Sequence, residues 1–142
     1  VNLLQATKRT KFLNPKMSTK NDDSISPLAT PSLTKRILTN IEEYRKRSIK
    51  KGANEVTKMI NRGKAMLVVL AADCNPIEII QHIPVLCNDK DVSYIYIESG
   101  EALGRACGVE RSIAAATFYY DSDEAYERMR VNVGGIINDI RT

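Results

Sequence analysis

The residues best suited to chemistry lie in one string of the sequence, KKGANEVTKMINRG, at residues 50–63. The string is rich in cations, yet it also contains a glutamate and two asparagines. On a helix, which advances about 100° per residue, its apolar residues share one face and its polar residues another. The apolar face consists of Val56, Met59 and Ile60. The polar face carries four side chains that can reach one partner, Asn54, Glu55, Lys58 and Arg62.

The glutamate on this polar face restricts the chemistry of the partner. Lys58 and Arg62 suit phosphate groups, because each neutralises a negative charge. A phosphate would repel Glu55, but a carboxylate accepts hydrogen bonds from amino and imino groups on base edges. Asn54 can donate and accept there as well, and Gly52 lets a backbone come close. The combination predicts base recognition surrounded by phosphate contacts.

Charge is distributed unevenly along the chain, which has 142 residues and a net charge of +4. Residues 35–64 hold ten Lys/Arg and three Glu, a net +7, whereas residues 65–142 hold six Lys/Arg and twelve Asp/Glu, a net −6. A basic block on one side of a domain indicates a polyanionic partner. The alternative is a solvated helix face on which Glu55 only pairs with Lys58 or Lys51, an interaction worth about 0.3–0.5 kcal/mol.

The elements that must position these residues follow from hydrophobic periodicity. Helices are expected at residues 33–51, 54–61, 75–90, 100–108 and 121–140, and strands at residues 65–72, 92–99 and 112–120. This alternation predicts an α/β fold, a three-layer α-β-α sandwich. We expect its sheet to be small, mixed and four-stranded, with one strand in addition to the three located above.

Capping and breaking residues set the limits of these helices. Ser32 and Ser99 are suited to cap the N-termini of the first and fourth helices. Gly63 and Gly108 end the second and fourth helices. We expect Pro84 to divide the third helix into two pieces and Gly134–Gly135 to interrupt the last one.

Residues 1–31 show little periodicity and include the polar, proline-containing string STKNDDSISPLATP. This composition is typical of a flexible extension, so we place the domain at residues 32–142. A natural start at Met17 would leave a short tail and make residues 1–16 an upstream extension.

Composition argues against several classes of protein. No apolar run approaches the roughly 20 residues that span a bilayer. The three cysteines are odd in number and irregularly spaced, which argues against a disulfide framework and favours a reducing compartment. Together with His82, the only histidine, they lack the paired spacing of a zinc site. Dinucleotide and phosphate loops are missing as well, so we expect neither metal nor cofactor. An enzyme, the less favoured alternative, would have to use Asp73, Cys74, His82 and Cys107.

Three strings resemble the kink-turn RNA-binding family that includes an archaeal large-subunit ribosomal protein. They are KKGANEVTKMINRG, LAADCNPIEIIQHIPVLCNDKDVSYIYI and ALGRACGV. The similarity is dense over residues 27–120 and looser over the last helix. The string LGRACGV favours the branch that binds U4 small nuclear RNA and box C/D small nucleolar RNAs over the box H/ACA and ribosomal branches.

The resemblance implies a target and a set of contacts. A kink-turn is a bent RNA helix with an internal bulge flanked by tandem sheared G·A pairs. In the family those pairs are contacted by residues that correspond to Asn54, Glu55 and Lys58, with Gly52 and Arg62 at the RNA backbone. A flipped-out bulge nucleotide lies against the counterpart of Ile79. The loop after ACGV adds the counterparts of Val109 and Arg111.

The chain departs from the family pattern near the implied bulge nucleotide. There, relatives carry Glu at the position of Asn75 and Lys at that of Gly100. In the loop that carries Arg111, they also have Pro at the position of Ser112. Asn75 can still hydrogen-bond a base, whereas Gly100 removes a cation. The resemblance further implies a non-enzymatic RNA-binding protein of the nucleus and nucleolus with protein partners in the tri-snRNP and in snoRNPs. The alternative within the same fold is a ribosomal protein that binds a kink-turn in large-subunit rRNA.

Overall fold

The computed structural model describes residues 26–120 and 123–141, and places a four-stranded sheet at the centre of the domain. The strands are β1 (Ile49–Lys51), β2 (Ala65–Ala71), β3 (Ser93–Ile97) and β4 (Ala115–Tyr119). Their order across the sheet is β1-β4-β2-β3. β2 and β3 run parallel, whereas β4 is antiparallel to both of its neighbours. The sheet is therefore mixed, as predicted.

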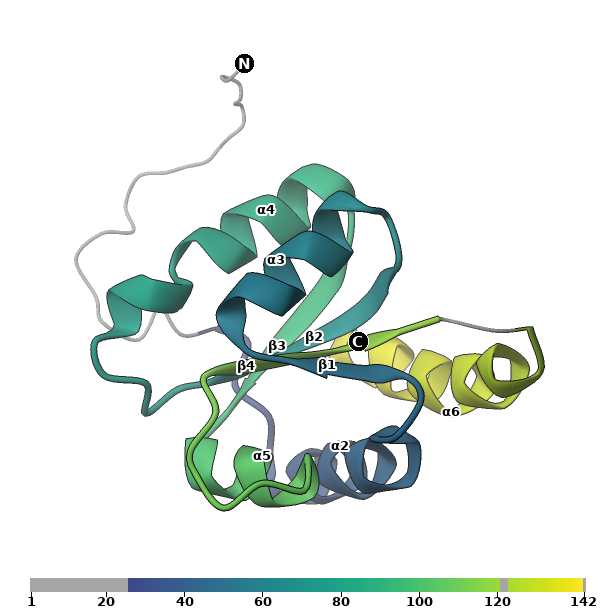
Figure 1. Ribbon diagram of the computed structural model, residues 1–142, viewed down its shortest axis with the longest axis horizontal. Helices are drawn as coiled ribbons and strands as arrows, with labels where there is room; N and C mark the ends of the chain where they lie inside the picture. The colour runs from purple at the N-terminus through teal and green to yellow at the C-terminus, as the bar shows by residue number, and fades with distance from the viewer. Residues whose placement is uncertain (1–25, 121–122, 142) are drawn as a thin grey trace.

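Helices cover both faces of the sheet, which Figure 1 shows nearly edge-on. One face carries α3 (Ala53–Asn61) and α4 (His82–Lys90). The other carries α2 (Pro31–Tyr44), α5 (Gly100–Ala106) and α6 (Asp123–Arg141). A short 3-10 helix, η2 (Ile77–Ile80), precedes α4. The three-layer α-β-α arrangement is confirmed.

Alternate residues of the central strand β2 supply the two hydrophobic cores. Leu67 and Val69 point into the core beneath α2, α5 and α6. Val68 and Leu70 point into the core beneath α3 and α4. All four are fully buried, because successive side chains of a strand face opposite sides and both sides are covered. This rigid strand ends at Ala71, where the segment that lines the candidate site begins.

The first helix differs from its prediction at both ends. Its N-cap is Thr30, whose hydroxyl accepts a hydrogen bond from the Leu33 amide at 3.2 Å, so the predicted cap at Ser32 is wrong. The helix ends at Tyr44, because the apolar stripe of the helix stops there and three exposed cations follow. Residues 49–51, predicted to be helical, form the edge strand β1 against β4.

The helix predicted at residues 75–90 consists of two pieces, as expected, but Pro84 does not divide them. η2 ends at Ile80 and α4 begins at His82, so the break lies at Gln81. Pro84 is the third residue of α4, within the first turn, where a missing amide N–H costs no helical hydrogen bond.

The last helix continues through Gly134–Gly135 without the predicted interruption. Val133 and Ile136 flank the pair and are fully buried in the core, so tertiary packing outweighs the low helix propensity of glycine.

The described end of the N-terminal region joins the domain at the β3 edge of the sheet. Leu28 forms a parallel bridge with Tyr96, whose amide donates to the Pro27 carbonyl at 2.8 Å. Ala29 is buried in the core. Residues 1–25, including Met17, lie outside the described residues.

Candidate nucleic-acid interface

Helix α3 presents the polar face that its sequence predicts. Val56, Met59 and Ile60 are buried beneath it against the sheet. The side chains of Asn54, Lys58 and Arg62 are exposed and Glu55 is half-buried. Within the described residues, Arg62 forms no salt bridge. Two cationic side chains and two side chains that can hydrogen-bond to base edges therefore share one accessible surface.

Gly52 anchors the start of α3 to the sheet. Its φ is +98°, a conformation that favours glycine, and its amide donates to the Ala115 carbonyl at 2.8 Å. No heavy atom lies within 4 Å of the position a Cβ would take. No side chain caps the helix, so its first amides have no side-chain acceptor, and an anion is favoured at such a helix N-terminus. Gly52 thus leaves open the close backbone approach expected from the sequence.

Glu55 and Lys58 form an ion pair on this face, with 3.5 Å between the carboxylate Oε2 and the ammonium Nζ. Their side chains are 44% and 57% exposed. An exposed pair one helical turn apart contributes only about 0.3–0.5 kcal/mol, so a competing ligand can open it at little cost. The pairing of Glu55 with Lys58 is thus realised in the free protein, and it is compatible with base contact by the same carboxylate.

A side-chain contact couples α3 to α4. The Thr57 hydroxyl donates to the Ala53 carbonyl at 2.8 Å and lies 2.9 Å from His82 Nε2. The hydroxyl has only one hydrogen, which it donates to Ala53. It therefore accepts a hydrogen bond from Nε2–H of His82. This contact and the shared apolar core hold η2 and α4 in place beside α3.

A cavity of about 340 Å³ lies beside the start of α3. It brings together three residues that the resemblance places near a bulge nucleotide, Asn75, Ile79 and Gly100, and it is also lined by Ser112. The cavity lies close to the start of α3, because Ala114 lines it and the next residue, Ala115, accepts the hydrogen bond from the Gly52 amide. Ile79 is 50% exposed, a large apolar side chain available for contact.

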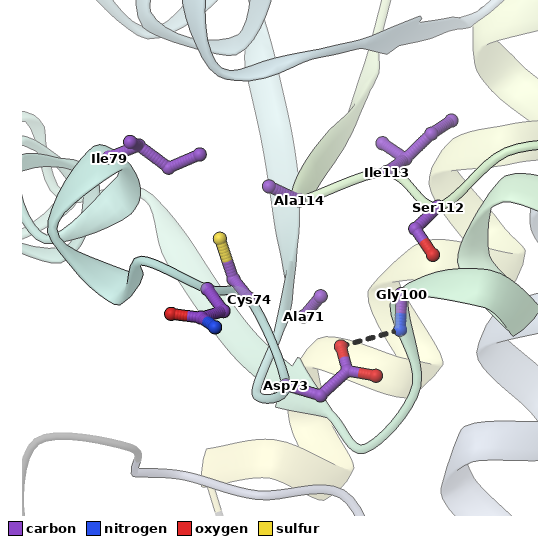
Figure 2. Close-up of a pocket in the computed structure, with 9 residues that line it drawn as sticks. Ala71, Asp73, Cys74, Ile79, Gly100, Ser112, Ile113 and Ala114 are labelled. Atoms are coloured by element: carbon purple, nitrogen blue, oxygen red, sulfur yellow. Dashed lines mark hydrogen bonds between the residues drawn. The ribbon is translucent and has the colours of Figure 1, made fainter.

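Asp73 also lines this cavity, although the sequence indicated it only as a possible catalytic residue. Its Oδ1 accepts a hydrogen bond from the Gly100 amide at 2.9 Å, the contact drawn in Figure 2. The neighbouring Cys74 also lines the cavity, and burial together with the Asp73 charge raises the pKa of its thiol. The sequence signal for Asp73 was its position just after the apolar run at residues 65–72, two residues beyond the end of β2.

The loop that carries Val109 and Arg111 folds back along α5. The amide of Val109 donates to the Gly104 carbonyl, and that of Ile113 donates to the Gly100 carbonyl, both at 3.0 Å. A Cβ at Gly104 would overlap the Arg111 carbonyl, so glycine is needed for this approach. Arg111 is exposed next to the cavity residue Ser112, whereas Val109 packs partly into the core.

The possible catalytic residues are dispersed. His82 lies on α4 above one face of the sheet, while Cys107 follows α5 on the other face and is buried. Burial raises the pKa of Cys107, which opposes thiolate formation. Among the described residues no group of three or more His, Cys, Asp or Glu is arranged to hold a metal ion, and no helix is long and apolar enough to cross a membrane.

Proteins similar to this chain include a ribonucleoprotein-associated protein and an RNA-binding protein. The 13 kDa ribonucleoprotein-associated protein of Saccharomyces cerevisiae is 51% identical over 92 residues, which cover 64% of this chain and 73% of the yeast protein. NHP2-like protein 1 of Xenopus laevis is 49% identical over 92 residues, 64% of this chain and 72% of that protein. The structure of the Giardia lamblia 15.5kD RNA binding protein matches with a TM-score of 0.75 and 38% identity, over 83% of this chain and 95% of that one.

The fold and these relatives define the class as an RNA-binding ribonucleoprotein domain, not an enzyme. The model of one family, ribosomal protein L7Ae/L30e/S12e/Gadd45, matches residues 36–126. The chain belongs to this family.

Proposed function

We propose that this protein binds kink-turn RNA through α3 and the adjoining cavity. The observation that carries the proposal is the exposed face of α3, which combines the base-edge groups of Asn54 and Glu55 with the cations Lys58 and Arg62. Distorted or unpaired RNA is where proteins read bases most readily, because the major groove of A-form RNA is too narrow for side chains.

Each part of the surface has a role in the proposed complex. Asn54, Glu55 and Lys58 contact the tandem sheared G·A pairs, while Gly52 and Arg62 face the RNA backbone. The bulge nucleotide enters the cavity, where Ile79 offers an apolar surface and Asn75 a hydrogen-bonding amide. Arg111 and Val109, on the loop beside the cavity, complete the contact region.

The RNAs we propose are the 5′ stem-loop of U4 small nuclear RNA and box C/D small nucleolar RNAs. Binding would nucleate assembly of the spliceosomal tri-snRNP and of snoRNPs, in the nucleus and nucleolus, and so serve mRNA splicing and rRNA processing. The name of the similar yeast protein, a ribonucleoprotein-associated protein, supports this choice.

A kink-turn in large-subunit rRNA is the second candidate target, favoured by the ribosomal proteins in the same family. The discriminating experiment is purification of the full chain from cells followed by sequencing of the bound RNA. Enrichment of U4 and box C/D RNAs supports the first target, whereas enrichment of large-subunit rRNA alone supports the second.

Specific recognition is tested by direct binding measurements on two RNAs, a kink-turn and the same RNA with its G·A pairs replaced by Watson–Crick pairs. We expect the replacement to weaken binding. Equal affinity for the two RNAs would contradict kink-turn recognition.

A further inference from the structure

A second group of exposed cations lies where α2 ends. Arg45, Lys46 and Arg47 follow the helix directly, and all three side chains are exposed. Residues 42–51 hold five Lys/Arg and two Glu, a net +3. Within residues 26–120 and 123–141, none of the residues in this segment forms a salt bridge. The three cations after α2 are therefore available to an anionic partner.

The backbone fixes the turn that carries these cations. The amides of Arg47 and Ser48 donate to the Tyr44 carbonyl at 3.1 Å and 2.9 Å. The Ser48 carbonyl in turn accepts a hydrogen bond from the Tyr119 amide of β4 at 2.9 Å. Tyr44 and Ser48 are buried, so the turn is tied to both the helix and the sheet. A fixed turn presents its charges at one place and loses little conformational entropy when a ligand binds.

Arg45 joins this turn to the loop that carries Arg111. A Cβ at Gly108 would lie 3.1 Å from Arg45 Nη1 and 3.5 Å from its Cδ, so the Arg45 side chain lies along Gly108. Gly108 follows α5, which lies beside α2 in Figure 1. Arg45 therefore reaches the start of a loop whose residues belong to the proposed RNA interface.

Lys51 continues the positive charge toward α3. It lies opposite Ala116 of β4, which belongs to the core beneath α2 and α5. Opposite residues of paired strands share a face, so the Lys51 side chain leaves β1 on that side. Burial raises the pKa of the Cys107 thiol, and the nearby charges of Lys51 and Arg45 offset part of this rise. Since the next residue is Gly52, the N-cap of α3, the basic surface runs from the end of α2 along the β1 edge to α3.

We propose that Arg45, Lys46 and Arg47 bind the phosphates of one stem that flanks the kink, outside the G·A pairs. This inference rests on the proposed kink-turn function. The rise of a strand, about 3.3 Å per residue, puts Ser48 roughly 13 Å from Gly52, so the turn meets RNA beyond the pairs that α3 contacts. A run of cations alone suits phosphates, which position the RNA without reading its sequence.

The test measures binding of the full chain to kink-turn RNAs in which either stem is long or short. We expect shortening of one stem to weaken binding and shortening of the other to have little effect. The double variant Arg45→Ala/Arg47→Ala should be insensitive to the length of the first stem. With long stems, its slope of log K against log salt concentration should be less steep by about two, which is about a 10-fold difference over a fourfold change in salt.

Lys35→Ala/Lys90→Ala is the matched control, because it removes the same net charge from other parts of the surface. Lys35 lies near the start of α2, and Lys90 ends α4, which packs on β3 at the opposite edge of the sheet from β1. Both side chains are exposed, and among the described residues neither forms a salt bridge. This variant should keep the stem-length dependence of the original chain.

A further variant separates charge from packing, since Arg45 also contacts Gly108 and cations stabilise a helix C-terminus. Arg45→Lys keeps the cation and should keep the slope, whereas Arg45→Ala should make it less steep by about one. Urea unfolding of the same proteins measures their stability. A lower free energy of unfolding with an unchanged slope in Arg45→Ala/Arg47→Ala would assign both arginines to the end of α2 and overturn the inference.

The remaining outcomes separate this inference from the proposed function. An equal loss of slope in both double variants, or a stem-length dependence that Arg45→Ala/Arg47→Ala leaves unchanged, overturns the phosphate site even where replacement of the G·A pairs weakens binding. Binding of the original chain that ignores the G·A pairs overturns the proposed function, and the assignment to a flanking stem with it.

Discussion

The carboxylate of Glu55 lies 3.5 Å from the ammonium group of Lys58, on the exposed face of α3. In the free protein the pair keeps an acidic side chain within a basic surface at little energetic cost. When RNA binds, both partners can exchange this contact for new ones, Glu55 for base donors and Lys58 for a phosphate or a base.

Lys58→Ala and Arg62→Ala should each reduce the salt dependence of kink-turn binding. Each lost phosphate contact lowers the slope of log K against log salt concentration by about one. Affinities measured at several salt concentrations give this slope. Arg130→Ala is the control, because Arg130 lies on α6 on the other face of the sheet and pairs with Glu127. A slope that falls equally in all three variants would mean that only net charge matters.

Ile79→Ala should affect mainly RNA binding, whereas the neighbouring substitution Ile80→Ala should affect mainly the stability of the fold. Ile79 is 50% exposed at the cavity, so its truncation should weaken binding of a kink-turn with a bulge nucleotide and leave the free energy of unfolding nearly unchanged. Ile80 is fully buried, and its truncation should lower that free energy by about 2–5 kcal/mol. Urea unfolding and RNA titration of both variants provide the comparison. Normal RNA affinity of Ile79→Ala would remove this residue from the interface.

Gly104→Ala and Gly134→Ala test where glycine is required. A Cβ at Gly104 would overlap the Arg111 carbonyl, so the loop must shift, and we expect a destabilisation of about 1–3 kcal/mol together with weaker RNA binding. Gly134 lies inside α6, and apart from its chain neighbours and the backbone of its own helix no heavy atom of the described residues lies within 4 Å of its Cβ position. Alanine there should stabilise the protein by about 0.5–1 kcal/mol. Denaturant unfolding measures both changes, and a stable Gly104→Ala protein with unchanged affinity would refute the role of this close approach.

Alkaline pH should destabilise the fold through Cys87. Burial raises the pKa of this thiol from 9.0 to about 12 in the folded protein. Above pH 9 the unfolded chain releases the thiol proton, whereas the folded chain retains it. The stabilisation of the fold by the protonated Cys87 thiol is therefore complete below pH 9 and is lost as the pH rises toward 12. The free energy of unfolding should fall by about 1.4 kcal/mol per pH unit for this one proton.

Urea unfolding between pH 8 and pH 10 measures this slope. Cys87→Ala should lower the free energy of unfolding at every pH, because a buried group is lost. It should also make that free energy less dependent on pH, by the contribution of one proton. Burial, together with the neighbouring Tyr94 and Cys87, raises the pKa of Tyr96 to about 12. Tyr96 therefore adds its own pH dependence to the free energy of unfolding above pH 10. An unchanged slope between pH 9 and pH 10 in Cys87→Ala would rule out this thiol as the cause.

The sequence predicted local features of the site better than long-range ones. The polar face of α3 follows from helical periodicity over nine residues, and all three of its apolar residues are buried as predicted. The edge strand β1 was missed because three residues with two lysines carry no strand signal of their own. Its hydrogen bonds come from β4, more than 60 residues away in the sequence.

The cavity illustrates the same limit. Asn75, Gly100 and Ser112 come from three separate segments, and only the family resemblance placed Asn75 and Gly100 near one nucleotide. Asp73 was missed as part of this group, because its contact with the Gly100 amide spans 27 residues. Periodicity cannot predict such a contact, since it depends on how the loops after β2 and β3 meet in the folded chain.

The most direct test of the account is a thermodynamic cycle that crosses Glu55→Ala with replacement of the G·A pairs by Watson–Crick pairs. If Glu55 reads the G·A pairs, the substitution should weaken kink-turn binding by about 1–3 kcal/mol and leave binding of the replaced RNA unchanged or slightly tighter. Glu42→Ala, which removes an exposed glutamate from α2 on the other face of the sheet, should show no such difference. A Glu55→Ala protein that binds both RNAs equally well, or more tightly than the original chain, would contradict base recognition by this carboxylate.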